Sequence, residues 1–101
     1  MNIFINEQKL TISDRLRQRI QTKFDSGLER LLKNYQDDLK NASLSIEKLQ
    51  RSGYQIKFDM NLPGCPVNIN KTSRVLFDGI ITVRNDAKRQ IKKALDKLRS
   101  H

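Results

Sequence analysis

Apolar residues in this chain follow two different spacings, and the order of these spacings constrains the fold more than any other feature of the sequence. Near the start, Ile3 and Ile5 alternate with polar residues and Phe4, which predicts a short strand over about residues 2–6 with apolar content on both faces. A spacing of three or four residues then predicts a helix over about 14–35, with Ser13 as its cap. The apolar positions of this helix are Leu16, Ile20, Phe24, Leu28, Leu31 and Tyr35.

Strict alternation replaces the helical spacing in the middle of the chain. Residues 42–47 and 54–61 alternate and predict two half-buried strands joined by a turn at 50–53. Pro63 and Gly64 suit the centre of a type II turn before a shorter strand around 67–70. Thr72 or Ser73 is expected to begin a second helix that continues to the C-terminus. Its apolar stripe is Leu76, Ile80, Val83, Ala87, Ile91, Ala94 and Leu98.

The predicted element order is therefore βαβββα. Polar residues alternate through three of the strands, so one face of the sheet is expected to be exposed to solvent and the other to lie under the helices. We call the solvent-exposed face the wet face. This pattern predicts an α+β fold, a two-layer sandwich with two helices packed on one face of a four-stranded sheet, as a single domain over 1–101. No aromatic platform for stacking bases is expected on the wet face, whose side chains include Ser43, Ser45, Gln55, Lys57, Asn68 and Asn70.

The scarcity of cysteine and histidine excludes most catalytic chemistry. Cys65 is expected in the turn that follows Pro63, and His101 is the last residue, where chain ends usually fray. Without an ordered histidine or a second cysteine, no nucleophile–histidine pair and no Cys/His zinc site is expected. We therefore expect no enzyme, no cofactor, no metal and no small-molecule substrate.

Targeting signals are also absent from the sequence. No apolar run exceeds three residues, and the first residues lack the basic and apolar stretches of a signal peptide. We expect a cytoplasmic protein without a membrane partner.

Charge is the main positive indication of function. Twenty Lys and Arg against eleven Asp and Glu give a net charge of +9, of which residues 51–101 carry +7. A field of this size attracts polyanions, and nucleic acid first among them.

A helical wheel separates the bases of the first helix from its acids. Five bases fall within roughly 80° of arc beside the apolar stripe: Arg15, Arg19, Lys23, Arg30 and Lys33. Arg17 points into the apolar arc, where its stem is expected to cover the edge of the core. Asp25 and Glu29 fall on the far side. Gly27, inside this helix, either weakens it by about 1 kcal/mol or marks a close packing contact.

The second helix is more basic. Arg84, Lys88, Lys92 and Arg99 follow one flank of its stripe, and Arg89, Lys93 and Lys97 lie farther round. With both helices on one sheet face, their basic flanks are expected to form one cationic surface that binds phosphates without reading bases. Lys57 and Lys71 are expected on or beside the wet face instead.

Several short motifs, in this order of elements, resemble a known family. They are Ile12-Ser13 before Leu16-Arg17, Lys23-Phe24 continuing to Leu28-Glu29-Arg30, Leu76-Phe77 before Gly79-Ile80, and the run from Lys88 to Lys93. Together they span most of the chain and resemble the short ribosome hibernation promoting factors, also called ribosome-associated inhibitor A or sigma-54 modulation proteins. The resemblance implies a protein in the decoding channel of the small ribosomal subunit. Such a protein contacts rRNA through its basic helices, overlaps the sites of mRNA and tRNA, and silences translation under stress.

The resemblance also assigns residues by position. Arg17 and Lys23 match basic positions of the family's first helix, and Arg89 and Lys93 match its second. Combined with the helical wheel, the expected rRNA-binding set is Arg15, Arg17, Arg19, Lys23, Arg30, Lys33, Arg84, Lys88, Arg89, Lys92 and Lys93.

Four positions depart from the family pattern and put individual contacts in doubt. Val75 stands where an acid is usual, Asp86 where a base is common, and Ser26 and Glu29 where bases occur. Because the sequence ends at His101, we expect neither the second domain by which long members pair ribosomes nor an acidic tail.

Two other classes share some of these features. A double-stranded-RNA-binding domain has the αβββα portion, but its basic motif belongs at the start of the last helix, and here Lys92 to Lys97 lie near the end. A protein-interaction module that modulates transcription is the other alternative. Such a module has no need of sorted bases, so retained binding after charge reversal on both helices favours it.

Overall fold

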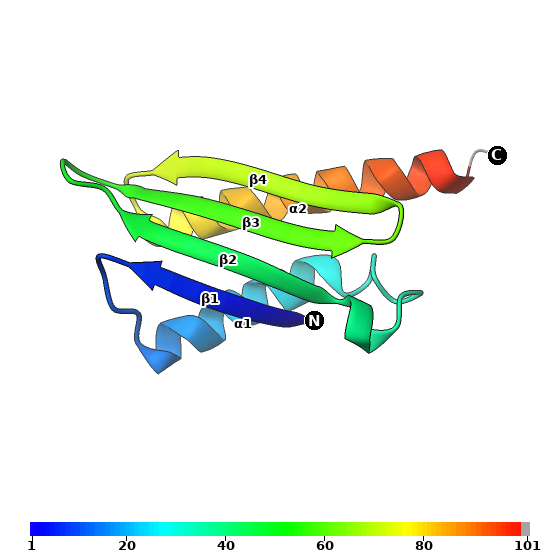
Figure 1. Cartoon of the computed structure of the whole chain (residues 1–101), viewed down its shortest axis with the longest axis horizontal. Coiled ribbons are helices and arrows are strands. Elements are labelled where there is room, and N and C mark those ends of the chain that lie inside the picture. Colours follow the sequence, from blue (N-terminus) through cyan, green and yellow to red (C-terminus); the bar gives the residue numbers. More distant parts are fainter. Residues whose placement is uncertain (100–101) are drawn as a thin grey trace.

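The computed structural model describes residues 1–99 and contains the expected elements in the expected order (Figure 1). The terminal His101, which we expect to fray, lies outside the described residues. Four strands, two α-helices and one short 3₁₀ helix follow one another: β1 (Asn2–Gln8), α1 (Asp14–Leu28), η1 (Asp37–Leu39), β2 (Asn41–Lys48), β3 (Tyr54–Leu62), β4 (Cys65–Ser73) and α2 (Leu76–Arg99).

The strands form one sheet in the order β1-β2-β3-β4. β1 and β2 are parallel, with Ile3 opposite Ala42, and α1 is the crossover between them. The other neighbours are antiparallel hairpins, with Leu44 opposite Phe58 and Phe58 opposite Ile69. The register places the apolar residues of β2, β3 and β4 on the same face, as the alternation predicts.

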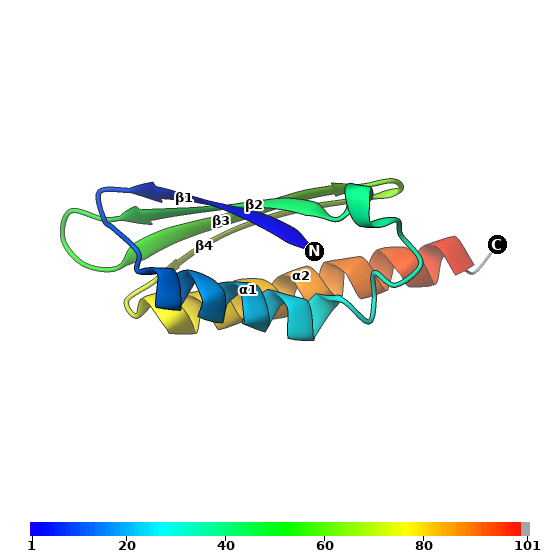
Figure 2. The same cartoon turned by 90° about the horizontal axis from the view of Figure 1, so that it is seen from below.

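Both helices cover that face, and the two layers enclose the core (Figure 2). Phe24 of α1 and Phe58 of β3 are fully buried and stack with ring centroids 4.9 Å apart. α1 begins as predicted, because the Ser13 hydroxyl accepts a hydrogen bond from the Leu16 amide at 3.1 Å. The predicted two-layer α+β sandwich is confirmed.

The first helix is shorter than predicted, since α1 ends at Leu28 rather than near residue 35. The chain continues in turns, with the Leu31 amide bonded to the Leu28 carbonyl and the Tyr35 amide to the Leu32 carbonyl. Leu32, four residues after Leu28, is fully buried, and its amide is bonded to the carbonyls of both Leu28 and Glu29. The Tyr35 hydroxyl reaches the Pro63 carbonyl at 3.3 Å. The regular helix therefore gives way to turns at Leu28, while the apolar side chains that follow it still pack against the core.

The boundary between the last strand and the second helix also differs from the prediction. Ser73 is the final residue of β4, opposite Tyr54, and α2 begins only at Leu76. The strand is longer than expected because it pairs along the whole of β3 and satisfies the backbone groups of residues 71–73. Cys65 is not a turn residue but the buried first residue of β4, opposite Leu62. Pro63 and Gly64 alone make the turn, with Gly64 at a φ of 76°.

Gly27 marks a close packing contact, as one reading of the sequence predicts. A Cβ atom on Gly27 would lie 2.6 Å from Cδ of Arg84 in α2. We expect Gly27→Ala to leave stability unimproved in the wild-type protein but to add about 0.5–1 kcal/mol when Arg84 is first replaced by Ala, because only then is the gain in helix propensity free of the clash. Urea unfolding of the four proteins of this cycle measures the coupling, and equal effects of Gly27→Ala in both backgrounds would refute the contact.

Candidate nucleic-acid interface

The two α-helices lie side by side and run in the same direction, so their basic flanks can meet along one line (Figure 2). Two contacts fix this line. The stem of Arg84 packs on Gly27, and the guanidinium of Arg19 lies over the ring of Phe77, 4.3 Å from its centroid. The bases of α1 and α2 thus flank a common seam.

Other bases join the seam through helical spacing. Arg15 precedes Arg19 by one turn, Lys23 follows it, and Lys88 and Lys92 follow Arg84 at intervals of four residues. Arg30 and Lys33, described below, complete this group of bases. We call the whole group the seam surface, and its members are Arg15, Arg19, Lys23, Arg30, Lys33, Arg84, Lys88 and Lys92.

Arg30 and Lys33 reach the seam although they lie beyond the end of α1. The turns after Leu28 keep both residues beside the second half of α2, where they line one groove with Lys92. The shorter helix therefore does not separate these two bases from the rest. Arg89 and Lys93 lie farther round α2 and line a shallow concavity with Lys92, Asp96 and Lys97.

Arg17, like Arg89 and Lys93, belongs to the expected set but lies outside the seam surface. It forms an ion pair with Glu7 of β1, whose carboxylate also accepts a hydrogen bond from the Ile12 amide at 2.7 Å. The side chain is partly buried, at 37% exposure, as expected of a stem over the edge of the core. Its charge is already neutralised within the protein.

Two acids at the end of α1, Asp25 and Glu29, are held away from the seam surface. Glu29 accepts a hydrogen bond from the N-terminal ammonium at 2.5 Å and lies 3.5 Å from the ammonium of Lys40. The hydrogen bond from the N-terminus, aided by Lys40, holds the pKa of the Glu29 carboxyl below its usual value. Asp25 lies 3.7 Å from the same N-terminal ammonium. These acids therefore compensate charges on the β1 side of α1 rather than those of the seam.

Asp86 of α2 joins two bases at the outer edge of the helix layer. It forms an ion pair with Arg89, and its other oxygen lies 3.3 Å from the ammonium of Lys71. The expectation that Lys71 belongs to the wet face is wrong, because it pairs in register with buried Ile56 and points to the helix side of the sheet. Burial alone would raise the pKa of Asp86, but the hydrogen bonds from Arg89 and Lys71 hold it below its usual value.

The lowered pKa of Asp86 predicts a contribution to acid sensitivity. A carboxyl with a depressed folded-state pKa stabilises the fold above its unfolded pKa, and this contribution is lost as the pH falls from about 5 through the folded pKa. Asp86→Asn is expected to flatten the pH dependence of the free energy of unfolding in that range, measured by urea titration at several pH values. Glu29 also has a lowered pKa, but it contributes equally in the wild-type protein and in the Asp86→Asn variant. An unchanged pH dependence in the variant would therefore contradict the role of Asp86.

The remaining departures from the family pattern lie at exposed positions. Ser26 is exposed on α1, and its hydroxyl donates to the Lys23 carbonyl at 3.2 Å. Val75 is 55% exposed just before α2. Neither side chain contributes to the core.

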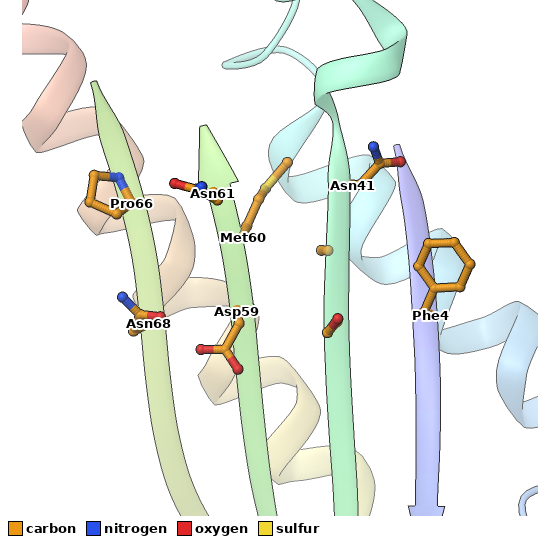
Figure 3. Close-up of a pocket in the computed structure, with 9 residues that line it drawn as sticks. Phe4, Asn41, Asp59, Met60, Asn61, Pro66 and Asn68 are labelled. Carbon is orange, nitrogen blue, oxygen red and sulfur yellow. The ribbon is translucent and has the colours of Figure 1, made fainter. Parts of the chain in front are cut away.

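The wet face of the sheet differs in character from the helix layer. Among residues 1–99, the side chains on this face that carry charge are Glu47, Lys57 and Asp59. One correction concerns aromatic residues: Phe4 of β1 is 64% exposed there, and it lines an open depression with Asp59 and several Asn side chains (Figure 3). A lone aromatic ring at the edge strand still provides no platform for successive bases.

No group of three or more His, Cys, Asp or Glu in residues 1–99 could hold a metal ion, and no helix there is long and apolar enough to cross a membrane. Burial raises the pKa of the Cys65 thiol, which disfavours the reactive thiolate.

Solved structures resemble this fold along most of its length. The Thermus thermophilus Protein Y N-terminal domain is 24% identical, with a TM-score of 0.72, over 92% of this chain and 98% of that one. A ribosomal subunit interface protein from Coxiella burnetii is 18% identical, with a TM-score of 0.74, over 92% of this chain and 96% of that one. No protein-family model and no curated protein matches the sequence. This chain therefore has the fold of these two proteins, which confirms the fold that the sequence resemblance implies.

Proposed function

We propose that this protein binds the small ribosomal subunit through the seam surface and blocks translation. In this proposal the helix layer faces rRNA in the decoding channel, where the protein overlaps the sites of mRNA and tRNA. Support comes from the fold, shared with a protein described as a ribosomal subunit interface protein, and from the basic helix layer. The protein acts in the cytoplasm as a binding factor rather than an enzyme.

The observation that carries the proposal is the number of uncompensated cations on one face. Several bases of the expected set have no ion pair or hydrogen bond from their side chains to another described residue: Arg15, Lys23, Arg30, Lys33, Lys88, Lys92 and Lys93. They come from both helices and the turns after α1, so folding gathers them. Unpaired cations on one surface match the regular negative charge of a phosphate backbone.

The arrangement favours phosphate contacts over reading of sequence. Lysines dominate the uncompensated set, and a lysine ammonium binds phosphate as a point charge, without the planar fork by which arginine recognises guanine. The contacts that rRNA would make at the seam are therefore expected to follow its shape and charge. The alternative of a double-stranded-RNA-binding module is less favoured, since Lys92, Lys93 and Lys97 lie in the last turns of α2 rather than the first.

The proposal predicts salt-sensitive binding to the small subunit. If about six phosphates are neutralised, the logarithm of the affinity is expected to fall against the logarithm of the salt concentration with a slope of about −4 to −5. Titration of labelled protein with purified small subunits at a series of KCl concentrations measures this slope. A slope near zero would rule out the phosphate mechanism.

A further inference from the structure

A groove crosses one end of the seam, between the turns after α1 and the second half of α2. Its walls come from two segments far apart in the sequence, and its lining residues are Arg30, Leu31, Lys33, Asn34, Lys92, Leu95 and Asp96. Leu31 and Leu95 are partly buried and pack against the core, so they form an apolar floor. The three basic side chains are exposed at its edges.

The charges around this groove are unbalanced. Arg30, Lys33 and Lys92 have no ion pair or hydrogen bond to another described side chain, whereas Arg17 and Arg89 are paired with Glu7 and Asp86. Asp96, the acid of the lining, has an interaction of its own. The groove thus combines unpaired positive charge at its rim with an apolar floor and the amide of Asn34.

This combination suits a nucleotide better than a bare anion. A phosphate alone would need only the rim cations and would leave the leucine floor in water. A nucleobase is a flat, largely apolar ring system with polar edges, and it would cover the floor while its phosphates meet the cations. An acidic peptide would satisfy the rim but would place no ring on the floor.

We propose that this groove holds one unpaired ribonucleotide of the bound RNA. The base lies over Leu31 and Leu95, an edge of the base meets the Asn34 amide, and the flanking phosphates contact Arg30, Lys33 and Lys92. The inference rests on the proposed function, because rRNA is the source of the strand, but it adds a base contact that the rest of the seam lacks. An unpaired nucleotide is favoured, since extracting a base from a duplex costs a few kcal/mol.

The test uses two single-stranded probes of equal length and charge, a short oligouridine and the same ribose-phosphate chain without bases. The wild-type protein is expected to bind the oligouridine about fivefold more tightly, the effect of covering about 40 Å² of apolar base surface. Amide resonances of residues 30–34 and 92–96 are expected to shift saturably with the oligouridine in NMR titrations. Equal affinity for both probes, or shifts spread evenly over both helices, would overturn the inference.

Two matched triple variants separate the groove from the general field. Replacing Arg30, Lys33 and Lys92 with Gln removes the phosphate contacts that hold the strand over the groove, so the base is no longer seated on the leucines and the preference for the oligouridine is expected to disappear. The same exchange at Arg15, Lys23 and Lys88 removes equal charge from the seam surface outside the groove, and is expected to weaken the binding of both probes while keeping the preference. If both variants keep the preference for the oligouridine, or both lose it, the groove does not hold the base.

Failure of the groove can be distinguished from failure of the proposed function. Wild-type protein that binds small subunits with the predicted salt dependence, but shows no preference between the two probes, would refute the groove and leave the seam surface intact. Binding of an acidic peptide to the groove with greater affinity than the oligouridine would likewise overturn it in favour of a protein ligand. Thermal unfolding of each variant confirms that lost binding does not reflect lost folding.

Discussion

A protein in which Lys88 and Lys92 are both replaced by Glu is expected to lose binding to the small subunit by about 100-fold or more, since each charge-assisted hydrogen bond contributes about 1.5–3 kcal/mol. Both side chains are exposed and neighbour each other on the flank of α2 that faces α1. The variant is also expected to lose inhibition of a cell-free translation reaction. Extending the change to Arg89 and Lys93 is expected to abolish both activities.

A matched control distinguishes the seam surface from net charge. Arg51, in the turn between β2 and β3, and Lys57, on the wet face of β3, are both exposed. Reversing these two bases changes the net charge by the same amount, and it is expected to slow association slightly while preserving inhibition. Equal loss in the two double variants would show that the overall field alone is responsible and that the seam surface is not the site.

Both double variants are expected to fold. The four side chains lie outside the apolar core, and surface substitutions of this kind usually change stability by about 0.5 kcal/mol or less each. Circular dichroism and urea unfolding check this before binding is compared.

Replacing Phe24 with Ala is expected to have the largest effect on the fold, about 3–5 kcal/mol. Phe24 is fully buried, and its ring stacks on Phe58 at an angle of 11°, so truncation leaves a cavity between α1 and the sheet. Because a small domain has a net stability of about 5–15 kcal/mol, much of the margin disappears, and α1 with its bases loosens from the sheet. Urea unfolding measures the loss.

Phe4 provides the control for this prediction. The same exchange, Phe4→Ala, removes a ring that is 64% exposed on the wet face and is expected to cost about 0.5 kcal/mol or less. Comparable losses for the two variants would contradict the assignment of the core to the helix side of the sheet.

The elements of this fold could be predicted from local spacing, but several of their ends could not. Leu31, Leu32 and Tyr35 continue the apolar helical spacing in the sequence, so the local pattern does not mark the end of the helix at Leu28. In the same way, Ser73 is a good helix cap by composition but pairs with Tyr54 instead. Local propensity is weak compared with burial and strand pairing, so such boundaries depend on contacts between distant segments.

The candidate site, too, could be predicted from the sequence only in part. A helical wheel could place Arg15, Arg19 and Lys23 on one face, because that face is a property of one helix. It could not show that Glu7 of β1 neutralises Arg17, or that Lys71 of β4 reaches Asp86. These pairs join residues from different elements, and only the packed sheet and helices bring them together. The alternation of the first strand does predict apolar content on both of its faces, but it could not show which of Phe4 and its neighbours Ile3 and Ile5 faces solvent.

The most direct test of this account is sedimentation of the wild-type protein with purified small and large ribosomal subunits, each in a separate tube, at near-physiological salt. The account predicts that the protein sediments with the small subunit, stays in the supernatant with the large subunit, and is released from the small subunit at high salt. It also predicts that the protein with Lys88 and Lys92 replaced by Glu remains in the supernatant in every tube. Sedimentation with the large subunit, or with both subunits equally, would contradict the claim that the seam surface recognises the small subunit.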